Sequence, residues 1–301
     1  MSNEGSYKVL MKRGEFVDEA RYNEDGSVRT VPFKLYYPSG EGIEKAPVIF
    51  WSHGYGGSRD GASFISRHLA SLGYVLVHLT HYGTDSSLWE GKPGHPWDVL
   101  RKLKISRETT INRFYDVPFA FDQMISWAQE NPDVGAIMDF ERVGMSGHSF
   151  GAMTTQVMAG MKFPNAQQEL FEIREPRFSA GILYSPVPIG HLTDVDPGQL
   201  YGGIDIPLLH MTGTDDASPL EDYGYEHRLI IRDNVPRDDQ YVQVLENGDH
   251  MVYNGTRGKL VQNPYRERHE AEIIEAVTHF WNAHLKDDPF AMDWVKQNLV
   301  S

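Results

Sequence analysis

The chain has 301 residues and a formal net charge of −14, from 42 acidic and 28 basic residues, and it contains no cysteine. The acidic excess argues against nucleic acid and anionic membrane surfaces as partners, because phosphate groups are bound by clustered lysine and arginine. The lack of cysteine excludes disulfide bonds, thiol catalysis and cysteine-ligated zinc.

The first twenty residues contain no apolar segment of the signal-peptide kind, and no apolar run approaches the roughly 20 residues of a membrane span. We therefore expect a cytoplasmic protein without stable membrane insertion, although a secreted mature form that has lost its leader would have the same sequence. No linker-like tract or internal repeat divides the chain, which favours a single domain over residues 1–301.

Strand-like and helix-like segments alternate along the chain. The expected strands are residues 7–11, 30–37, 47–51, 74–79, 142–146, 180–184, 207–212 and 241–246. The expected helices are residues 60–72, 107–129 (interrupted or kinked near Pro118), 150–160, 270–285 and 289 to about 299. This alternation predicts an α/β fold with a mostly parallel central sheet and helices on both faces. Sites in such sheets lie at the carboxyl ends of strands.

Two segments depart from this regular pattern. Pro32 lies inside the second expected strand, which favours an edge position for that strand. Residues 81–105 are irregular and rich in glycine, proline and tryptophan, so we expect a loop-like or lid-like insertion around residues 81–118.

Ser149 stands in the stretch Gly147-His148-Ser149-Phe150-Gly151, between an apolar strand and a helix. A Gly-x-Ser-x-Gly pattern alone occurs often by chance, but the strand–turn–helix setting is typical of a nucleophilic serine. The turn needs tiny residues on both sides, and it exposes the hydroxyl at a helix N-terminus. We predict that Ser149 is a nucleophile; the alternative is a structural turn.

A serine hydroxyl needs a base and an orienting carboxylate, and the order expected for this motif is serine, then acid, then histidine. His250 follows the strand at 241–246 and precedes the long final helix, which is where a catalytic base belongs. His191 and His227 are weaker rivals. The remaining downstream histidines lie in a strand or on the last long helix: His210, His269, His279 and His284.

The acid is expected after the strand at 207–212, where two aspartates follow each other. We favour Asp216 over Asp215 because Asp216 lies three residues after Gly213, the usual offset in this kind of loop. Asp215 would then be solvated or would cap the next turn. Asp249 adjoins His250, but neighbouring side chains usually diverge.

The oxyanion hole needs two backbone N–H groups. One is expected from Phe150, directly after the nucleophile. The other is expected from Tyr55, which follows His53-Gly54 in the glycine-rich loop after the strand at 47–51. We expect His53 to brace this loop rather than to act as a base.

With these motifs in place, the chain resembles the α/β-hydrolase superfamily, and in particular the platelet-activating-factor acetylhydrolase family and its dienelactone-hydrolase-like or chlorophyllase-like bacterial relatives. The resemblance rests on residues 48–87 and on "GHSFGA", and it spans about residues 30–285. It implies the same oxyanion positions, Tyr55 and Phe150. One departure matters: the acetylhydrolase acid follows the strand that ends here in "GILYSPVP", which holds no carboxylate. Phospholipid specificity therefore does not carry over.

We predict a serine hydrolase of carboxylic esters that works on short to medium acyl groups through an acyl-enzyme, without metal or cofactor. The substrate is expected to be a small or polymeric ester. Pocket walls are expected from Tyr82, Trp89, Trp97, Pro186, Val187 and Met251. Trp89 and Trp97 fit a substrate-contacting wall or simple packing of the loop equally well. A polyester or lactone hydrolase, an acyltransferase and a binding protein on the same scaffold remain as alternatives.

Overall fold

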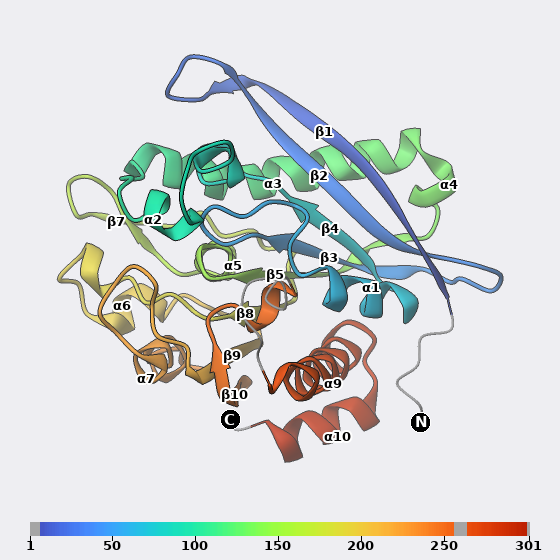
Figure 1. Cartoon of the computed structure of the whole chain (residues 1–301). Coiled ribbons are helices and arrows are strands. Elements are labelled where there is room, and N and C mark those ends of the chain that lie inside the picture. Colours follow the sequence, from blue (N-terminus) through green and yellow to red (C-terminus); the bar gives the residue numbers. More distant parts are fainter. Residues whose placement is uncertain (1–6, 256–263, 300–301) are drawn as a thin grey trace.

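Eight strands form one sheet, in the order β1-β2-β4-β3-β5-β8-β9-β10, in this computed structural model, which describes residues 7–255 and 264–299 (Figure 1). Their bounds are β1 Lys8–Tyr22, β2 Val28–Ser39, β3 Ala46–Ser52, β4 Val75–Leu79, β5 Met138–His148, β8 Ala180–Tyr184, β9 Leu208–Asp215 and β10 Gln240–Asp249. The strands from β4 to β10 pair in parallel, whereas β2 is antiparallel to both β1 and β4. The expected mostly parallel α/β sheet is confirmed. A small separate pair joins β6 (Phe163–Pro164) to β7 (Leu170–Phe171).

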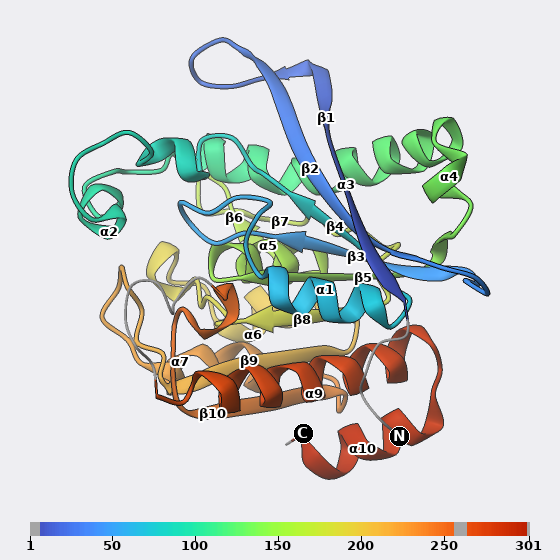
Figure 2. The same cartoon turned by 45° about the vertical axis from the view of Figure 1, so that its right-hand side comes forward.

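Helices cover both faces of the sheet (Figure 2). Their bounds are α1 Ser63–Ser71, α2 Pro96–Leu100, α3 Arg107–Glu130, α4 Pro132–Gly135, α5 Phe150–Met158, α6 Pro197–Tyr201, α7 Tyr225–Arg228, α8 Ile230–Asp233, α9 Arg266–Leu285 and α10 Pro289–Asn298. In Figure 2, α1 and α9 lie in front of the sheet, and α3 and α5 lie behind it.

Two apolar cores result, one on each face of the sheet. Successive residues of β3 alternate between them: Val48 and Phe50 pack with α3 and α5, whereas Ile49 and Trp51 pack with α1, α9 and α10. Because both faces are covered, every residue of β3 and β4 is buried, and both strands read as continuous apolar runs.

The expected edge position of the second strand is wrong. β2 lies between β1 and β4, because β1 extends over 15 residues and covers it. Pro32 is tolerated because it stands at the end of the β2–β4 ladder. There its carbonyl accepts the N–H of Thr80 at 2.8 Å, so the missing proline N–H costs only the last bond of the ladder.

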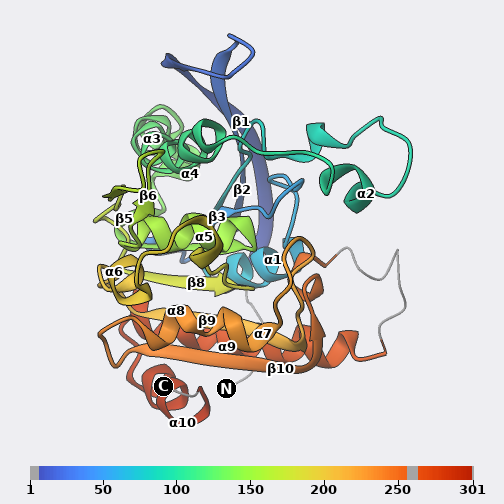
Figure 3. The same ribbon diagram turned by 90° about the vertical axis from the view of Figure 1, so that its left-hand side faces the viewer.

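The irregular segment after β4 contains a 3₁₀ turn at Ser86–Leu88 and the short helix α2, and it ends at Ser106, where α3 begins. In Figure 3 this segment and α2 stand away from the sheet. The helix α3 then continues through Pro118 to Glu130. Residues 107–118 of the expected insertion are therefore helical, and α3 is not interrupted at Pro118.

The carboxyl ends of the parallel strands meet at one edge of the sheet. Ser52, the last residue of β3, pairs with Gly147 of β5, and His148 pairs with Tyr184, the last residue of β8. The loops that follow β3, β5, β8, β9 and β10 therefore gather around the turn that carries Ser149.

Candidate active site

Ser149 links β5 directly to α5 with a backbone that few residues adopt. Its φ of 56° and ψ of −116° lie outside the ordinary helix and strand regions. Its N–H donates to the carbonyl of Tyr184 at 2.8 Å. A Cβ at Gly147 would collide with the carbonyl of Gly151, and a Cβ at Gly151 would collide with the carbonyl of Ser52. The two glycines are thus required by close backbone approach, and the packing around the turn holds Ser149 in its strained conformation.

The structure brings together the three side chains that chain order selects. The Oγ of Ser149 lies 3.0 Å from Nε2 of His250, and Nδ1 of His250 lies 2.7 Å from Oδ1 of Asp216. The other carboxylate oxygen of Asp216 accepts the hydroxyl of Thr212 at 2.9 Å. Ser149 is half-buried, whereas Asp216 is fully buried. This is the pattern of a hydroxyl facing a base whose far nitrogen is held by a carboxylate.

Backbone geometry separates the two neighbouring aspartates. The N–H of Asp216 donates to the carbonyl of Gly213 at 2.9 Å, which closes a tight turn after β9. Asp216 turns inward, while Asp215 is exposed. Asp249 instead accepts the N–H of Met251 at 2.8 Å.

A buried arginine, Arg228, contacts both Asp216 and His250, and it was not predicted from the sequence. Nη2 of Arg228, at the end of α7, lies 3.0 Å from Oδ1 of Asp216 and 3.2 Å from Nδ1 of His250. The same guanidinium donates to the carbonyls of Asp216 and Pro186, at 3.0 and 2.9 Å. Burial alone would raise the pKa of Asp216, but contacts with His250 and Arg228 outweigh it and leave that pKa below its usual value.

The two expected oxyanion donors lie beside the serine. Among the described residues, neither the N–H of Tyr55 nor that of Phe150 has a hydrogen-bond acceptor. Gly54 packs so closely that a Cβ there would lie 3.4 Å from the Cβ of Ser149. The Tyr55 loop therefore approaches Ser149 through a residue without a side chain, and two N–H groups remain for a ligand oxygen.

Neighbouring histidines are held as neutral structural groups. Nε2 of His148 lies 2.6 Å from the carbonyl of His250, and burial lowers the pKa of His148 to about 3. Burial also holds the pKa of His53 well below its usual value. The two rival histidines, His191 and His227, are exposed.

Two cavities of about 530 and 510 Å³ meet at Ser149 and His250. Both are also lined by Tyr55 and Leu100, which lie between them. Apolar residues line part of the first cavity: Phe150, Met153, Phe163, Val187 and Leu192. Charged residues line it as well: Arg101, Arg107, Glu221 and Arg228. The second has aromatic walls and passes along the segment before α3: Trp51, Trp89, Pro96, Trp97 and Met251. A ligand bound at Ser149 thus has room on two sides.

Three of the six residues expected in the pocket walls line the second cavity: Trp89, Trp97 and Met251. Trp89 also packs its loop, because its Nε1–H donates to the carbonyl of Gly56 at 2.7 Å.

The expectation for Pro186 is wrong in position. Pro186 is buried and lines neither cavity, because it lies where its carbonyl binds Arg228; Val187, the next residue, lines the first cavity instead. Tyr82 lines neither cavity either, and its hydroxyl donates to Asp25 at 2.7 Å.

Neither a metal centre nor a membrane-crossing helix is found in the part of the chain that the structure describes. No group of three or more histidine, aspartate or glutamate side chains within residues 7–255 and 264–299 is arranged to hold a metal ion. No helix within those residues is long and apolar enough to cross a bilayer.

Comparison with known proteins agrees with this picture. The sequence model of platelet-activating factor acetylhydrolase, isoform II, matches residues 26–90, which include the Tyr55 loop but not the Ser149 turn. No curated protein sequence gave a significant match. Among solved structures, the ferulic acid esterase from Streptomyces cinnamoneus superposes with a TM-score of 0.62 at 17% identity, over 93% of this chain and 91% of that chain. The chain therefore has the α/β-hydrolase fold, and these findings support a carboxylic ester hydrolase.

Proposed function

We propose that the chain hydrolyses carboxylic esters through Ser149, His250 and Asp216, with an acyl-enzyme intermediate. The observation that carries this proposal is the 3.0 Å contact between Oγ of a strained, accessible Ser149 and Nε2 of His250. Asp216 orients the imidazole from its other side at 2.7 Å.

The reaction follows from the positions of these groups. His250 takes the hydroxyl proton as Ser149 attacks the ester carbonyl, and the carbonyl oxygen becomes an oxyanion that accepts the N–H groups of Tyr55 and Phe150. The imidazolium then gives its proton to the departing alkoxide, which leaves as an alcohol. Water, activated by His250, attacks the acyl-enzyme, and the carboxylic acid leaves as Ser149 regains its proton.

The first test uses a fluorophosphonate probe, which reacts with an activated serine. The wild-type protein should be labelled at Ser149, as found by peptide mapping, and it should release p-nitrophenol from p-nitrophenyl butyrate. A folded protein that neither reacts with the probe nor cleaves any ester would favour a binding protein on this scaffold.

For the substrate we infer an uncharged or weakly charged ester with a short to medium acyl group. The −14 net charge disfavours anionic substrates, and each cavity is of the size that holds a small organic group rather than a long lipid chain. Rates should fall from short to long p-nitrophenyl esters. Strong activation on long-chain triglyceride or phospholipid would contradict this inference.

A second candidate is an ester of an aromatic acid. It is favoured by the aromatic walls of the second cavity, Trp89 and Trp97, and it agrees with the name of the ferulic acid esterase that shares the fold. Methyl ferulate and a polyester film, compared with p-nitrophenyl butyrate at equal enzyme concentration, would separate aryl-ester, polyester and simple alkyl-ester preferences.

A further inference from the structure

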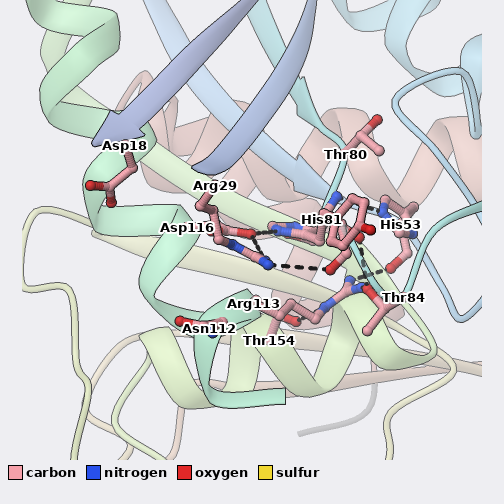
Figure 4. A network of polar contacts seen from close by, with 12 residues as sticks. Asp18, Arg29, His53, Thr80, His81, Thr84, Asn112, Arg113, Asp116 and Thr154 are labelled. Carbon is pink, nitrogen blue, oxygen red and sulfur yellow. Dashed lines mark hydrogen bonds and ion pairs between the residues drawn. The ribbon is translucent and has the colours of Figure 1, made fainter. Parts of the chain in front are cut away.

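Arg113 is a fully buried cation beside the site that has no part in the proton transfers above (Figure 4). Among the described residues no carboxylate lies within ion-pair distance of it. Its bonds go instead to three neutral oxygens: the carbonyl of His53, Oγ1 of Thr84 at 2.8 Å and Oγ1 of Thr154 at 2.8 Å. Burial lowers its pKa to about 9, so the side chain stays charged at neutral pH. A buried charge without a charged partner is costly and calls for a reason.

The bonds of Arg113 reach both halves of the oxyanion hole. Nη2 donates to the carbonyl of His53, two residues before Tyr55. Nε donates to Thr154, one turn into the helix whose first residue is Phe150. The guanidinium also lies 4.5 Å from the centre of the Phe150 ring. One side chain therefore ties together the two segments that supply the N–H donors.

The Tyr55 loop, which supplies one of the two N–H donors, is also held in place by the ring of His53. The backbone N–H of His81 donates to Nε2 of His53 at 3.0 Å, so the ring proton must be on Nδ1, which donates to the carbonyl of Gly54 at 2.7 Å. In a trans peptide the carbonyl and the following N–H point in opposite directions. Fixing the Gly54 carbonyl therefore fixes the direction of the Tyr55 N–H.

Asp116 anchors this arrangement from one turn further along α3. It accepts Nδ1–H of His81 at 2.9 Å and two bonds from Arg29, at 2.7 and 2.6 Å (Figure 4). Burial would raise the pKa of Asp116, but the bonds from His81 and Arg29 outweigh it and keep the group ionised. A polar network thus runs from Asp116 of α3 to the carbonyl of Gly54, which belongs to the same peptide group as the Tyr55 N–H.

We propose that Arg113 is a positioning residue that holds the N–H groups of Tyr55 and Phe150 at the mutual spacing that an oxyanion needs. The proposal rests on the proposed ester hydrolysis. Without Arg113, the loop and the helix would still carry their donors, but nothing would tie His53 to Thr154 through a rigid planar group. The loss would fall on the transition state, where the oxyanion exists, and little on ground-state binding.

The sharpest test compares two valines on α5. Thr154 and Thr155 are both buried, and each donates its hydroxyl to the carbonyl four residues earlier, at 2.9 and 3.0 Å. Only Thr154 also accepts a bond from Arg113. Thr154→Val and Thr155→Val therefore remove the same local bond, and the first alone removes the contact with the guanidinium.

The readouts are kcat and KM for p-nitrophenyl butyrate and the inhibition constant of an alkyl trifluoromethyl ketone, whose serine adduct carries an oxyanion. Losing one oxyanion donor costs on the order of 10²–10³ in kcat, so we expect about 10²-fold for Arg113→Gln and roughly tenfold for Thr154→Val. Ketone binding should weaken in parallel with KM nearly constant. Arg113→Lys should recover part of the loss, and Thr155→Val should stay within about twofold of wild type.

Urea unfolding of each variant identifies the variants that fold. If Arg113→Gln does not fold, Thr154→Val and Thr84→Val still test the proposal, because each removes one contact of the guanidinium. Equal effects of the two valine variants would overturn the proposal, as would a folded Arg113 variant with wild-type ketone binding or one that changes KM alone. A wild-type protein that cleaves no ester and takes no fluorophosphonate would instead refute the proposed function.

Discussion

Two serine–histidine–aspartate sets with the same hydrogen-bond pattern occur in the described part of the chain: an inner set, Ser52, His81 and Asp116, and an outer set, Ser149, His250 and Asp216. The serine–histidine contact is 3.0 Å in both sets. The histidine–aspartate contact is 2.9 Å in the inner set and 2.7 Å in the outer one. In both, an arginine also contacts the carboxylate, Arg29 in the inner set and Arg228 in the outer.

The two sets differ in what surrounds the serine. Ser52 is fully buried at the end of a regular strand, so no substrate reaches it. Ser149 lines both cavities, occupies a strained turn at the start of a helix, and faces two N–H groups without acceptors among the described residues. The serine–histidine and histidine–aspartate distances alone therefore do not distinguish a candidate nucleophile from a structural serine. Access from a cavity and nearby N–H groups without acceptors do distinguish them.

The largest expected difference between the sets is in turnover. Ser149→Ala should lower ester turnover by a factor on the order of 10⁶, the cost of losing a triad nucleophile. Ser52→Ala should keep activity within about tenfold, because Ser52 only donates to His81 behind the Tyr55 loop. Turnover of p-nitrophenyl butyrate by enzyme free of wild-type contamination checks both. More than a few per cent of activity in Ser149→Ala would remove that residue from the mechanism.

The next largest difference is expected between the two neighbouring aspartates, Asp216 and Asp215, in their effect on kcat. Asp216→Asn should reduce kcat by about 10⁴, the scale seen when a triad acid is neutralised. Asp215→Asn is the matched control, since its side chain is exposed and should cost far less. Thermal unfolding of both variants excludes collapse of the loop. A large loss on Asp215 alone would reverse the assignment while leaving a triad in place.

The inner acid should matter for folding. Asp116→Asn leaves the buried guanidinium of Arg29 without its carboxylate, so we expect the free energy of unfolding to fall by about 3–5 kcal/mol. Urea titration measures this change. Arg237 and Asp239 form a partly exposed pair at 2.5 Å, and Asp239→Asn should change stability by less than about 1 kcal/mol. Equal losses in the free energy of unfolding for Asp116→Asn and Asp239→Asn would contradict the expected role of the inner set in stability.

Stability should also fall with acidity from about pH 6.5 downward. Burial lowers the pKa of His81 and His210 to about 4 and that of His78 to about 3. The unfolded chain, with histidine pKa values near 6.5, then binds more protons, so stability is full above that pH and is lost as pH falls toward the folded pKa values. Urea unfolding between pH 8 and 5 measures the slope, and His210→Gln should make it shallower. A flat profile over this range would contradict the buried neutral state.

The smallest effect should come from chelation. In the proposed mechanism the outer set works by proton transfer between side chains. No metal-ligand group is found among the described residues. EDTA should leave ester turnover unchanged within error. Loss on chelation that is restored by added zinc or calcium would place a metal in the mechanism.

The sequence allowed Ser149, Asp216 and His250 to be selected as candidates because the signals for these residues are local. The glycines around Ser149, the offset from Gly213 to Asp216 and the loop after β10 each act through a few neighbouring residues. These signals selected Ser149, Asp216 and His250, and the structure brings the three side chains within hydrogen-bond distance of one another.

Residues whose role depends on distant contacts escaped the sequence. Arg113 lies in an expected helix and Arg228 in a stretch for which no element was expected, and no local pattern marks either residue. Both are fully buried, and their partners lie up to 60 residues away along the chain. Pro186 was expected in a pocket wall because it follows a strand, but the backbone after β8 turns its carbonyl toward Arg228. The edge expectation for β2 failed because the first strand was expected only at residues 7–11, whereas β1 continues through Gly14 to Tyr22 and covers β2.

In the proposed mechanism, the meeting of two cavities at Ser149 decides which molecule attacks the acyl-enzyme. When the alcohol departs from the acyl-enzyme, the cavity that held it, here called the alcohol arm, is left empty beside His250. The molecule that enters this arm next is the acyl acceptor. Water enters an empty arm freely, whereas an added alcohol shaped like the leaving group has a binding site already built for it. Partition between hydrolysis and transesterification is then set by occupancy of that arm, and it should shift toward ester synthesis as the concentration of a well-fitting alcohol rises.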